Sequence, residues 1–443
     1  MSDSDVPSTN LVADVIDDGT ASGQQFLVVG LCMLFNMVDG FDITAMAVVA
    51  SSVGSELNLE ADKVGMIFSF ALAGMVAGSM ILAPISDFIG RRKLIIAGLV
   101  LVGVSMILTA SATTLTEFVT LRFISGLGAG TLLASQAALA AEYSPEKYRS
   151  LAVTTVTCGY PMGAMMTSVV AGVVMPEHGW RGMFWFGGVT TIVFALIALA
   201  LIPESLKFIL ERRPANALEK ANRILARLKK QTLTQLPEIT HAESGSAGSM
   251  VSNVATLFQR GTWAATLTLW VSFFLCFSTL YFLMSWIPTL MENSGYSAAD
   301  GRRAFFLFNF SAIIGIFVLG TLSTRWKLSN LVSGFLISSS VLMVVFAMSP
   351  SVLGPLMAIT FAIGFTQQGG FTGLYAIAAK VYPTEIRSTG VGWAIGIGRL
   401  GAVAGPWVAG YLIAAGLSMS ANYFVFAVPM AIGGILAYRL HVK

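Results

Sequence analysis

The stretch FLVVGLCMLFNMVDGFDITAMAVVA, residues 26–50, is an apolar run that contains two aspartates, Asp39 and Asp42. A helix needs about 20 mostly apolar residues to cross the hydrocarbon core of a bilayer, so this run is long enough to span a membrane. Ionisable side chains within such spans are rare and generally mark ion or substrate pathways. The stretch therefore predicts a transmembrane helix that carries a functional acidic pair.

The composition of the whole chain agrees with a membrane protein. Of 443 residues, 55% are hydrophobic and 11% are charged, whereas a soluble protein carries roughly 25% charged residues. The net charge of +3 is too small to favour nucleic acid as a partner. Cys32, Cys158 and Cys276 all fall in apolar runs, so we expect buried free thiols and no disulfide framework.

Twelve apolar runs are long enough to be transmembrane helices. They cover residues 26–50, 64–83, 94–112, 115–140, 151–174, 183–202, 263–290, 304–324, 329–348, 352–380, 388–413 and 421–439. We expect an all-α polytopic protein with a disordered cytoplasmic tail (1–25), an N-terminal six-helix half (26–202), a cytoplasmic central loop with short amphipathic helices (203–262) and a C-terminal six-helix half (263–443). The first 25 residues have no basic region ahead of the first run, so no cleavable signal peptide is expected.

The distribution of Lys and Arg predicts the orientation. If the N-terminus is cytoplasmic, 20 of the 26 basic residues fall in cytoplasmic segments and four in outer loops. Because cytoplasmic loops carry an excess of Lys and Arg, both termini are expected on the cytoplasmic side. The remaining two, Arg122 and Arg399, fall within predicted spans.

The two halves repeat at an offset of 238 residues. AEYSPEKYRSLAV (141–153) aligns with AKVYPTEIRSTGV (379–391), and Val170-Ala171-Gly172 aligns with Val408-Ala409-Gly410. Two six-helix halves in parallel register are typical of transporters whose substrate site lies near the bilayer midplane, between the halves.

Several motifs resemble those of the major facilitator superfamily over nearly the whole chain. They are GSMILAPISDFIGRRK (78–93), LRFISGLGAG (121–130), PESLKF (203–208) and YPTEIRSTGVGW (382–393). Within that superfamily, DGFD (39–42) and GRLGAVAGP (398–406) resemble the aromatic acid:proton symporters. The resemblance implies uptake of hydroxybenzoate, protocatechuate or gallate-like acids with protons across a bacterial cytoplasmic membrane, by a monomer without a cofactor. The second-half counterpart of the Gly-Arg-Arg motif, GTLSTRWKLSN (320–330), lacks the Asp, so the resemblance does not extend to a symmetric gating role for this loop.

The acidic pair is the predicted site of proton coupling. Asp39 and Asp42 lie at i and i+3, on one face of a helix, and two charged carboxylates would repel each other in a medium of low dielectric. One of them is therefore expected to carry a proton at the working pH. The three histidines lie outside the predicted spans, which leaves proton coupling to carboxylates. The alternative is that the pair only caps a helix break at Gly40 or forms hydrogen bonds with neighbouring backbone groups.

The substrate-binding residues are expected among the remaining polar and aromatic side chains of the spans. A guanidinium stays charged and can hold a carboxylate through two hydrogen bonds, so Arg399 and Arg122 are the candidates for the substrate carboxylate. The alternative for each is an ion pair with Asp39 or Asp42, or a hydrogen bond to a helix carbonyl. Candidates for the aromatic ring and its hydroxyls are Tyr281, Trp286, Asn309, Gln367, Gln368 and Trp393.

A third group is predicted to gate the cytoplasmic side through charges that join the halves in one state and separate in the other. Its members are Asp87, Gly90, Arg91, Arg92, Glu142, Arg149, Glu385 and Arg387. Their alternative is an ordinary basic loop turn.

Other functions remain open at this point. Another proton symporter of the same superfamily, for a different organic anion or a sugar, shares several of these motifs, and a nutrient receptor without transport could share all of them. An enzyme is not expected, because the spans contain no nucleophile–base constellation and no histidine-rich metal cluster, and the chain has no phosphate-binding glycine loop.

Overall fold

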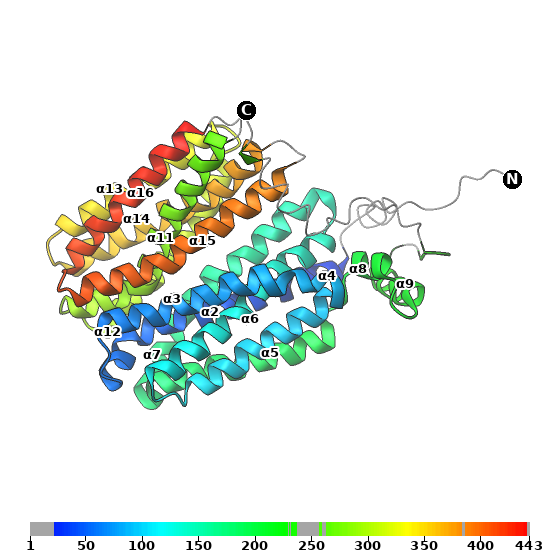
Figure 1. Ribbon diagram of the computed structural model, residues 1–443, viewed down its shortest axis with the longest axis horizontal. Coiled ribbons are helices and arrows are strands. Elements are labelled where there is room, and N and C mark those ends of the chain that lie inside the picture. Colours follow the sequence, from blue (N-terminus) through cyan, green and yellow to red (C-terminus); the bar gives the residue numbers. More distant parts are fainter. Residues whose placement is uncertain are drawn as a thin grey trace.

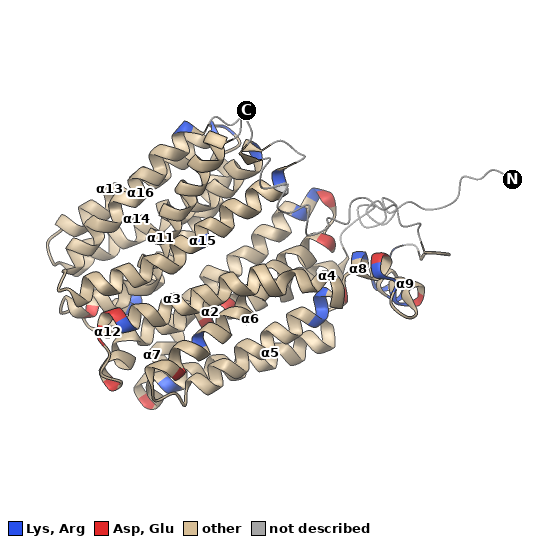
Figure 2. Ribbon diagram, in the orientation of Figure 1, with Lys and Arg blue, Asp and Glu red and all other residues tan. Residues whose placement is uncertain are grey.

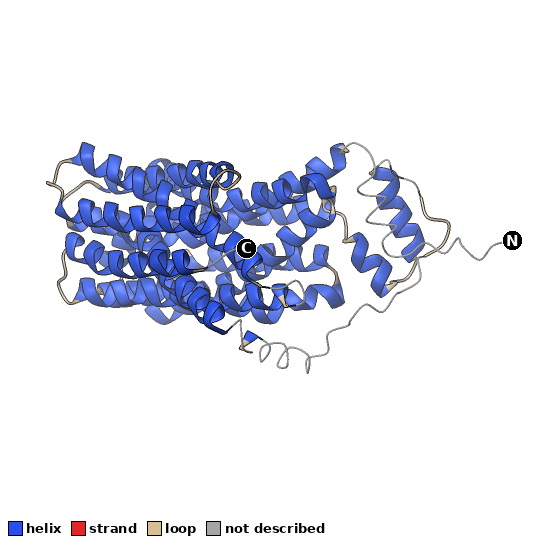
Figure 3. Cartoon of the chain, turned by 90° about the horizontal axis from the view of Figure 1, so that it is seen from above, coloured by secondary structure: helices blue, strands red, loops and turns tan. Residues whose placement is uncertain are grey.

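The computed structural model is helical in all the regular structure that it describes (Figure 3). The described residues are 22–228, 230, 232–236, 257–258, 263–382 and 386–440. The long helices run side by side along the molecule, and charged residues gather mainly near the two ends of this bundle (Figure 2). This is the distribution that a bilayer imposes, because charges are costly in its hydrocarbon core.

The first half of the chain forms five long helices. They are α2 (Gly23–Glu56), α3 (Ala61–Ala77), α5 (Arg91–Thr109), α6 (Leu115–Glu142) and α7 (Glu146–Leu201). After α3 the chain passes through a π-helical turn, a 3-10 turn that contains Pro84, and the short α4 (Ser86–Ile89). Gly90 then adopts a positive φ of 99°, which allows α5 to start in a new direction.

The second half forms six long helices. They are α11 (Trp263–Asn293), α12 (Ala298–Leu322), α13 (Leu328–Met348), α14 (Leu353–Val381), α15 (Arg387–Ala414) and α16 (Met419–Arg439). The two halves form adjacent bundles (Figure 1).

The predicted transmembrane runs correspond to these helices. Ten helices among the described residues are long and apolar enough to cross a membrane. One of them, the 56-residue α7, is long enough to cross twice and is broken by a non-helical residue at Gly179. The 29-residue α14 is not among the ten, because Gln367 and Gln368 make its middle less apolar, but it too is long enough to cross. Together these helices account for the twelve predicted crossings.

Equivalent helices pack together in the two halves. In the first half α2 packs on α7, α3 on α6, and α5 on both α6 and α7. In the second half α11 packs on α15, α12 on α14, and α13 on both α14 and α16. This matching arrangement is the structural form of the internal repeat.

Glycines spaced four apart bring the helices close. Gly74 of α3 and Gly78, the first residue of the π-helical turn that follows α3, lie against the backbone of α6. Gly401 and Gly405 of α15 lie against the backbone of α11. Small residues at this spacing let helix backbones approach closely, which is how helices associate in lipid.

The halves meet mainly along α3 and α15. Gly65 faces Pro406 and Gly410 without room for a side chain, and the Ser69 hydroxyl donates to the carbonyl of Val403 (2.7 Å). This seam occupies the start of α3 and the later part of α15, which is the side of the membrane predicted to be outer.

Two short helices of the central segment lie beside α4, at the opposite end of the first half (Figure 1). They are α8 (Leu206–Arg212) and α9 (Ala217–Arg227). Leu206, Ile209 and Leu210 of α8 are buried, and the Arg212 guanidinium lies 4.6 Å from the centre of the Phe88 ring. The predicted amphipathic helices of the central segment are thus present in its described part.

Candidate functional site

The two aspartates of α2 have different surroundings, although both side chains are fully buried. The Asp42 carboxylate accepts a hydrogen bond from Arg122 Nη1 (2.8 Å) and another from Ser125 Oγ (2.5 Å). Arg122, which is 1% exposed, also donates to the Asp42 carbonyl (3.3 Å) and lies 4.9 Å from the centre of the Phe184 ring. Asp42 is therefore held as one member of a buried ion pair between α2 and α6.

Asp39 has no such partner. Both of its carboxylate oxygens are buried, and neither makes a hydrogen bond within the described part of the chain. A charged carboxylate in this place would be unpaired in a medium of low dielectric, which costs several kcal/mol or more. The arrangement of Asp39 thus suits a carboxyl group that binds a proton.

Two tyrosines connect the surroundings of Asp39 to the second half. Tyr160 of α7 lies within electrostatic range of Asp39 and Asp42, and its phenol lies close to that of Tyr281 of α11. The Tyr160 hydroxyl nevertheless makes no hydrogen bond of ordinary distance and angle among the described residues. Backbone packing places Tyr160 here, because Gly40 fits directly against its carbonyl group.

Arg399 of α15 lies at the other side of these tyrosines. Its guanidinium is within electrostatic range of Tyr281 and Tyr375, and Nη1 donates to Ser79 Oγ (3.1 Å), which belongs to the other half. Arg399 has no acidic partner among the salt bridges of the described residues. A half-buried guanidinium without a carboxylate is suited to an anionic ligand.

An aromatic wall lies next to Arg399. Phe277 stacks on Tyr281 at a centroid distance of 6.1 Å, and Phe371 meets Phe277 edge-on at 4.6 Å. Gly398, the neighbour of Arg399 in the chain, packs directly against the Phe277 ring. Flat aromatic faces of this kind can bind an aromatic ring.

The predicted amide candidates are buried in the second half. Gln367 is fully buried, and neither of its amide atoms has a hydrogen-bond partner in the described structure. Gln368 is 7% exposed. Asn309 donates to the Phe305 carbonyl of its own helix (2.9 Å), while its side-chain oxygen has no partner among the described residues. Unpaired buried amides are rare in folded proteins and need an explanation, which a ligand or water would supply.

The two predicted tryptophans already have protein partners. Trp286 is 1% exposed, donates to the Pro406 carbonyl (3.0 Å), and packs edge-on against Phe68 of the first half at 5.4 Å. It belongs to the outer seam. Trp393 stacks on Trp270 at 6.1 Å.

Four of the predicted gating residues, Gly90, Arg91, Arg92 and Glu142, form contacts within the first half. Arg91 Nη1 pairs with Glu142 (2.6 Å), which also accepts from Ser205 Oγ (2.6 Å). The backbone amide of Arg92 donates to Glu204 (3.0 Å), whose carboxylate lies against Gly90 and leaves no room there for a side chain. This cluster joins the starts of α5 and α8 to the end of α6.

The other gating candidates are Arg149, Arg387, Glu385 and Asp87. Arg149 lies exposed in the first turn of α7, and Arg387 donates to the Tyr382 carbonyl at 3.5 Å. Glu385 and the side chain of Asp87 lie outside the described residues.

Sequence reasoning did not include Ser125, Tyr160, Phe184 or Ser79. Ser125 could have been found, because it follows Arg122 by three residues and so shares its helix face. Nothing in the sequence distinguishes Tyr160, Phe184 or Ser79 from other residues of apolar runs. The prediction for cysteine is confirmed, since Cys32, Cys158 and Cys276 are buried and free. The described residues contain no cluster of acidic, histidine or cysteine side chains that could hold a metal ion.

Taken together, a helical bundle with a buried ion pair, an isolated carboxyl and an arginine between two repeated halves defines a membrane transporter. A family model described as "Major Facilitator Superfamily" matches residues 32–350 and 269–443. The chain therefore belongs to the major facilitator superfamily and is a multi-pass membrane transporter.

Relatives with assigned substrates match almost the whole chain. It is 29% identical over 427 residues to the 4-hydroxybenzoate transporter PcaK of Acinetobacter baylyi, covering 96% of this chain and 93% of that protein. It is 28% identical to the benzoate transport protein of the same organism, covering 97% and 92%. It is also 28% identical to a gallate transporter of Pseudomonas putida, covering 94% and 92%. The predicted resemblance to aromatic acid transporters is thus confirmed as sequence similarity over almost the whole chain.

Solved structures share the fold. The inward-open xylose transporter XylE of E. coli superposes with a TM-score of 0.72 at 15% identity, covering 94% of this chain and 96% of that chain. A bacterial homologue of the lysosomal transporter Spinster gives the same TM-score at 14% identity, covering 95% and 97%. At these identities the likeness concerns the fold alone.

Proposed function

We propose that this transporter carries small aromatic carboxylates, such as hydroxybenzoates, benzoate or gallate, into the cell together with protons. The relatives at 28–29% identity move such acids, and an aromatic wall stands beside an arginine in the interior of this chain. A bacterial cytoplasmic membrane is the proposed location, and a monomer the proposed unit.

The observation that carries the proposal is the isolated carboxyl group of Asp39. It is fully buried without a hydrogen-bond partner in the described structure, whereas Asp42 is fixed by Arg122 and Ser125. We assign the transported proton to Asp39. Asp42 keeps Arg122 in place and takes part in coupling only when that ion pair opens.

The substrate carboxylate is assigned to Arg399. Arg122 already pairs with Asp42. Among the described residues, the hydrogen-bond partner of Arg399 is a serine hydroxyl of the opposite half. An anion that binds Arg399 would compete for this link between the halves. Substrate binding and the relative movement of the halves are thereby connected.

The predicted gating role is assigned to the cluster around Arg91, Glu142 and Glu204. In this conformation its described contacts stay within the first half. We therefore propose that this cluster acts as a switch. When the cytoplasmic side closes, its residues would leave their partners in the first half and bind residues of the second half.

The energetics follow from charge. If one proton accompanies a monoanion, no net charge moves, and the pH gradient drives uptake. Each further proton adds one inward charge, which the membrane potential favours by about 2.3 kcal/mol per 100 mV.

Uptake of labelled 4-hydroxybenzoate into proteoliposomes with an imposed pH gradient tests the proposal. Wild-type protein should accumulate the acid when the interior is alkaline, and Asp39→Asn should lose accumulation while still exchanging internal for external substrate. Asp62→Asn is the matched control, because it makes the same chemical change in a residue near the outer end of α3. Accumulation by Asp39→Asn equal to that of wild type would refute the assignment of the proton.

Competing substrates separate the alternatives. Benzoate and gallate should reduce uptake, whereas xylose and succinate should not. Competition by a sugar or an aliphatic acid would indicate a different symporter of the superfamily. Binding of the aromatic acid without any uptake would indicate a receptor.

A further inference from the structure

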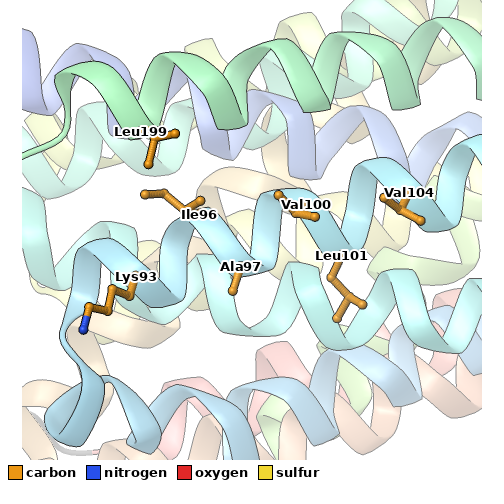
Figure 4. A pocket seen from close by; sticks show the side chains of 7 residues that line it. All are labelled: Lys93, Ile96, Ala97, Val100, Leu101, Val104 and Leu199. Atoms are coloured by element: carbon orange, nitrogen blue, oxygen red, sulfur yellow. The ribbon is translucent and has the colours of Figure 1, made fainter.

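We infer that the lipid-facing surfaces of α5 and of the last part of α7 together form a binding site for one acyl chain of an anionic phospholipid in the cytoplasmic leaflet. A groove of about 560 Å³ runs along α5 here, and Figure 4 shows the side chains that line it. Ile96, Val100, Val104 and Leu199 form its apolar walls, and Lys93 lies at one end. This inference concerns the lipid-facing surface of the bundle and goes beyond the proposed transport reaction.

The groove exists because α5 and α7 contact each other at two levels along their length, one toward each end of the groove. In the middle of the helices Gly103 and Gly188 bring the backbones together without room for side chains. At the cytoplasmic end Arg92 Nη2 donates to the Leu199 carbonyl (2.6 Å). Between these contacts the short side chains of α5, among them Ala97, leave the surface hollow.

The length of the groove corresponds to one leaflet. Lys93 and Val104 are eleven residues apart, which is about 16 Å along a helix at 1.5 Å per residue. The hydrocarbon core of a bilayer is about 30 Å thick, so the groove runs from the headgroup level to the midplane. Val100 and Val104 are 42% and 44% exposed, as expected of side chains that face lipid.

The charges at the cytoplasmic end favour a negative headgroup. Lys93 is exposed and has no salt bridge among the described residues, and the Arg92 guanidinium lies at the same end. Arg91 is neutralised by Glu142. The Glu204 carboxylate, which accepts hydrogen bonds from the backbone amides of Arg92 and Ser205, adds one negative charge against the two positive charges of Arg92 and Lys93. A phosphate placed at Lys93 would meet two basic side chains, while its acyl chain would fill the apolar groove.

Native mass spectrometry of the detergent-solubilised full chain, titrated with phosphatidylglycerol or phosphatidylethanolamine, tests the site. Lys93→Gln should reduce retained phosphatidylglycerol about fivefold, which is the contribution of one lysine near an anionic headgroup. Retention of phosphatidylethanolamine should not change. Lys147→Gln is the matched control, because Lys147 is also exposed in a first helical turn at the cytoplasmic side but lies outside the groove.

A second variant tests the groove itself. Ala97→Phe fills the hollow at an exposed position and should displace the acyl chain, so retention of both lipids should fall while the protein still folds. Val169→Phe is the control, because Val169 is an exposed residue of α7 outside the groove. This variant should retain both lipids. Unchanged phosphatidylglycerol retention in Lys93→Gln, or an equal loss in Lys147→Gln, would overturn the inference.

Discussion

Substitution of Asp42 by Asn is expected to destabilise this transporter strongly, whereas the same change at Asp39 is expected to cost little. Asp42 and Arg122 are 0% and 1% exposed, and the pair has one short N–H···O contact of 2.8 Å. Removing one partner of a buried ion pair costs about 3–5 kcal/mol, because the other charge stays buried and unpaired. Arg122 would have little compensation, since Nε and Nη2 already lack hydrogen-bond partners in the described structure.

The Phe184 ring would remain as a partner of the guanidinium, and a cation–π contact contributes about 0.5–2 kcal/mol. The Asn oxygen could also still accept a hydrogen bond from Arg122. The expected loss for Asp42→Asn is therefore near the lower end of the range, about 3 kcal/mol. Asp39→Asn removes no hydrogen bond between described residues, so its expected loss is below about 1 kcal/mol on the usual scale of single substitutions.

Thermal unfolding of the purified variants in one detergent, followed by tryptophan fluorescence, provides the comparison. Asp42→Asn should unfold at a clearly lower temperature than Asp39→Asn. The double variant Asp42→Asn/Arg122→Met should recover part of the loss, because it removes the unpaired charge as well. Equal destabilisation by Asp39→Asn and Asp42→Asn would show that the two carboxylates do not differ in the way described here.

Three further outcomes follow from the site and the seam. Gly65→Leu should abolish uptake, because its Cβ would lie 2.8 Å from the Pro406 carbonyl oxygen and hold the outer seam apart. Gly172→Leu should transport normally in the same assay, because a Cβ at Gly172 would meet no atom within 4 Å. Arg399→Lys should raise the KM for 4-hydroxybenzoate at least tenfold, because an ammonium group cannot hold a carboxylate through two parallel hydrogen bonds; an unchanged KM would move the carboxylate site elsewhere. Arg91→Gln should slow uptake without changing substrate affinity, because Glu142 would lose its ion pair and keep the Ser205 hydroxyl as its described hydrogen-bond partner. Equilibrium binding and initial rates measured together would reveal any loss of affinity.

The division of the acidic pair has a consequence for the transport cycle. A carboxyl that is buried alone can gain or lose a proton without breaking another contact, whereas protonation of Asp42 would release Arg122. In the proposed transport cycle the two groups therefore respond at different steps. Asp39 responds to the proton supply, and Asp42 responds to a movement of α6 against α2.

The sequence by itself determined the class of protein, the transmembrane runs and the repeat. Bilayer thickness sets the length of an apolar run, and the distribution of Lys and Arg predicts its orientation, so both can be counted along the chain. The motifs at residues 78–93 and 121–130 indicated the superfamily, which the family match confirms. The sequence also placed Asp39 and Asp42 on one helix face, because three residues make nearly one helical turn.

Only the tertiary structure decided how the members of each predicted group differ. Asp42 has a partner because Arg122, 80 residues further along the chain, approaches it from α6, while no described side chain bonds to Asp39. Trp286 lies in the outer seam because Pro406, 120 residues away, accepts its N–H. Helical periodicity specifies which residues share a face, but it does not specify which face of another helix that surface will meet. That choice depends on how backbones pack at glycines such as Gly40 and Gly74, against segments far away in the sequence.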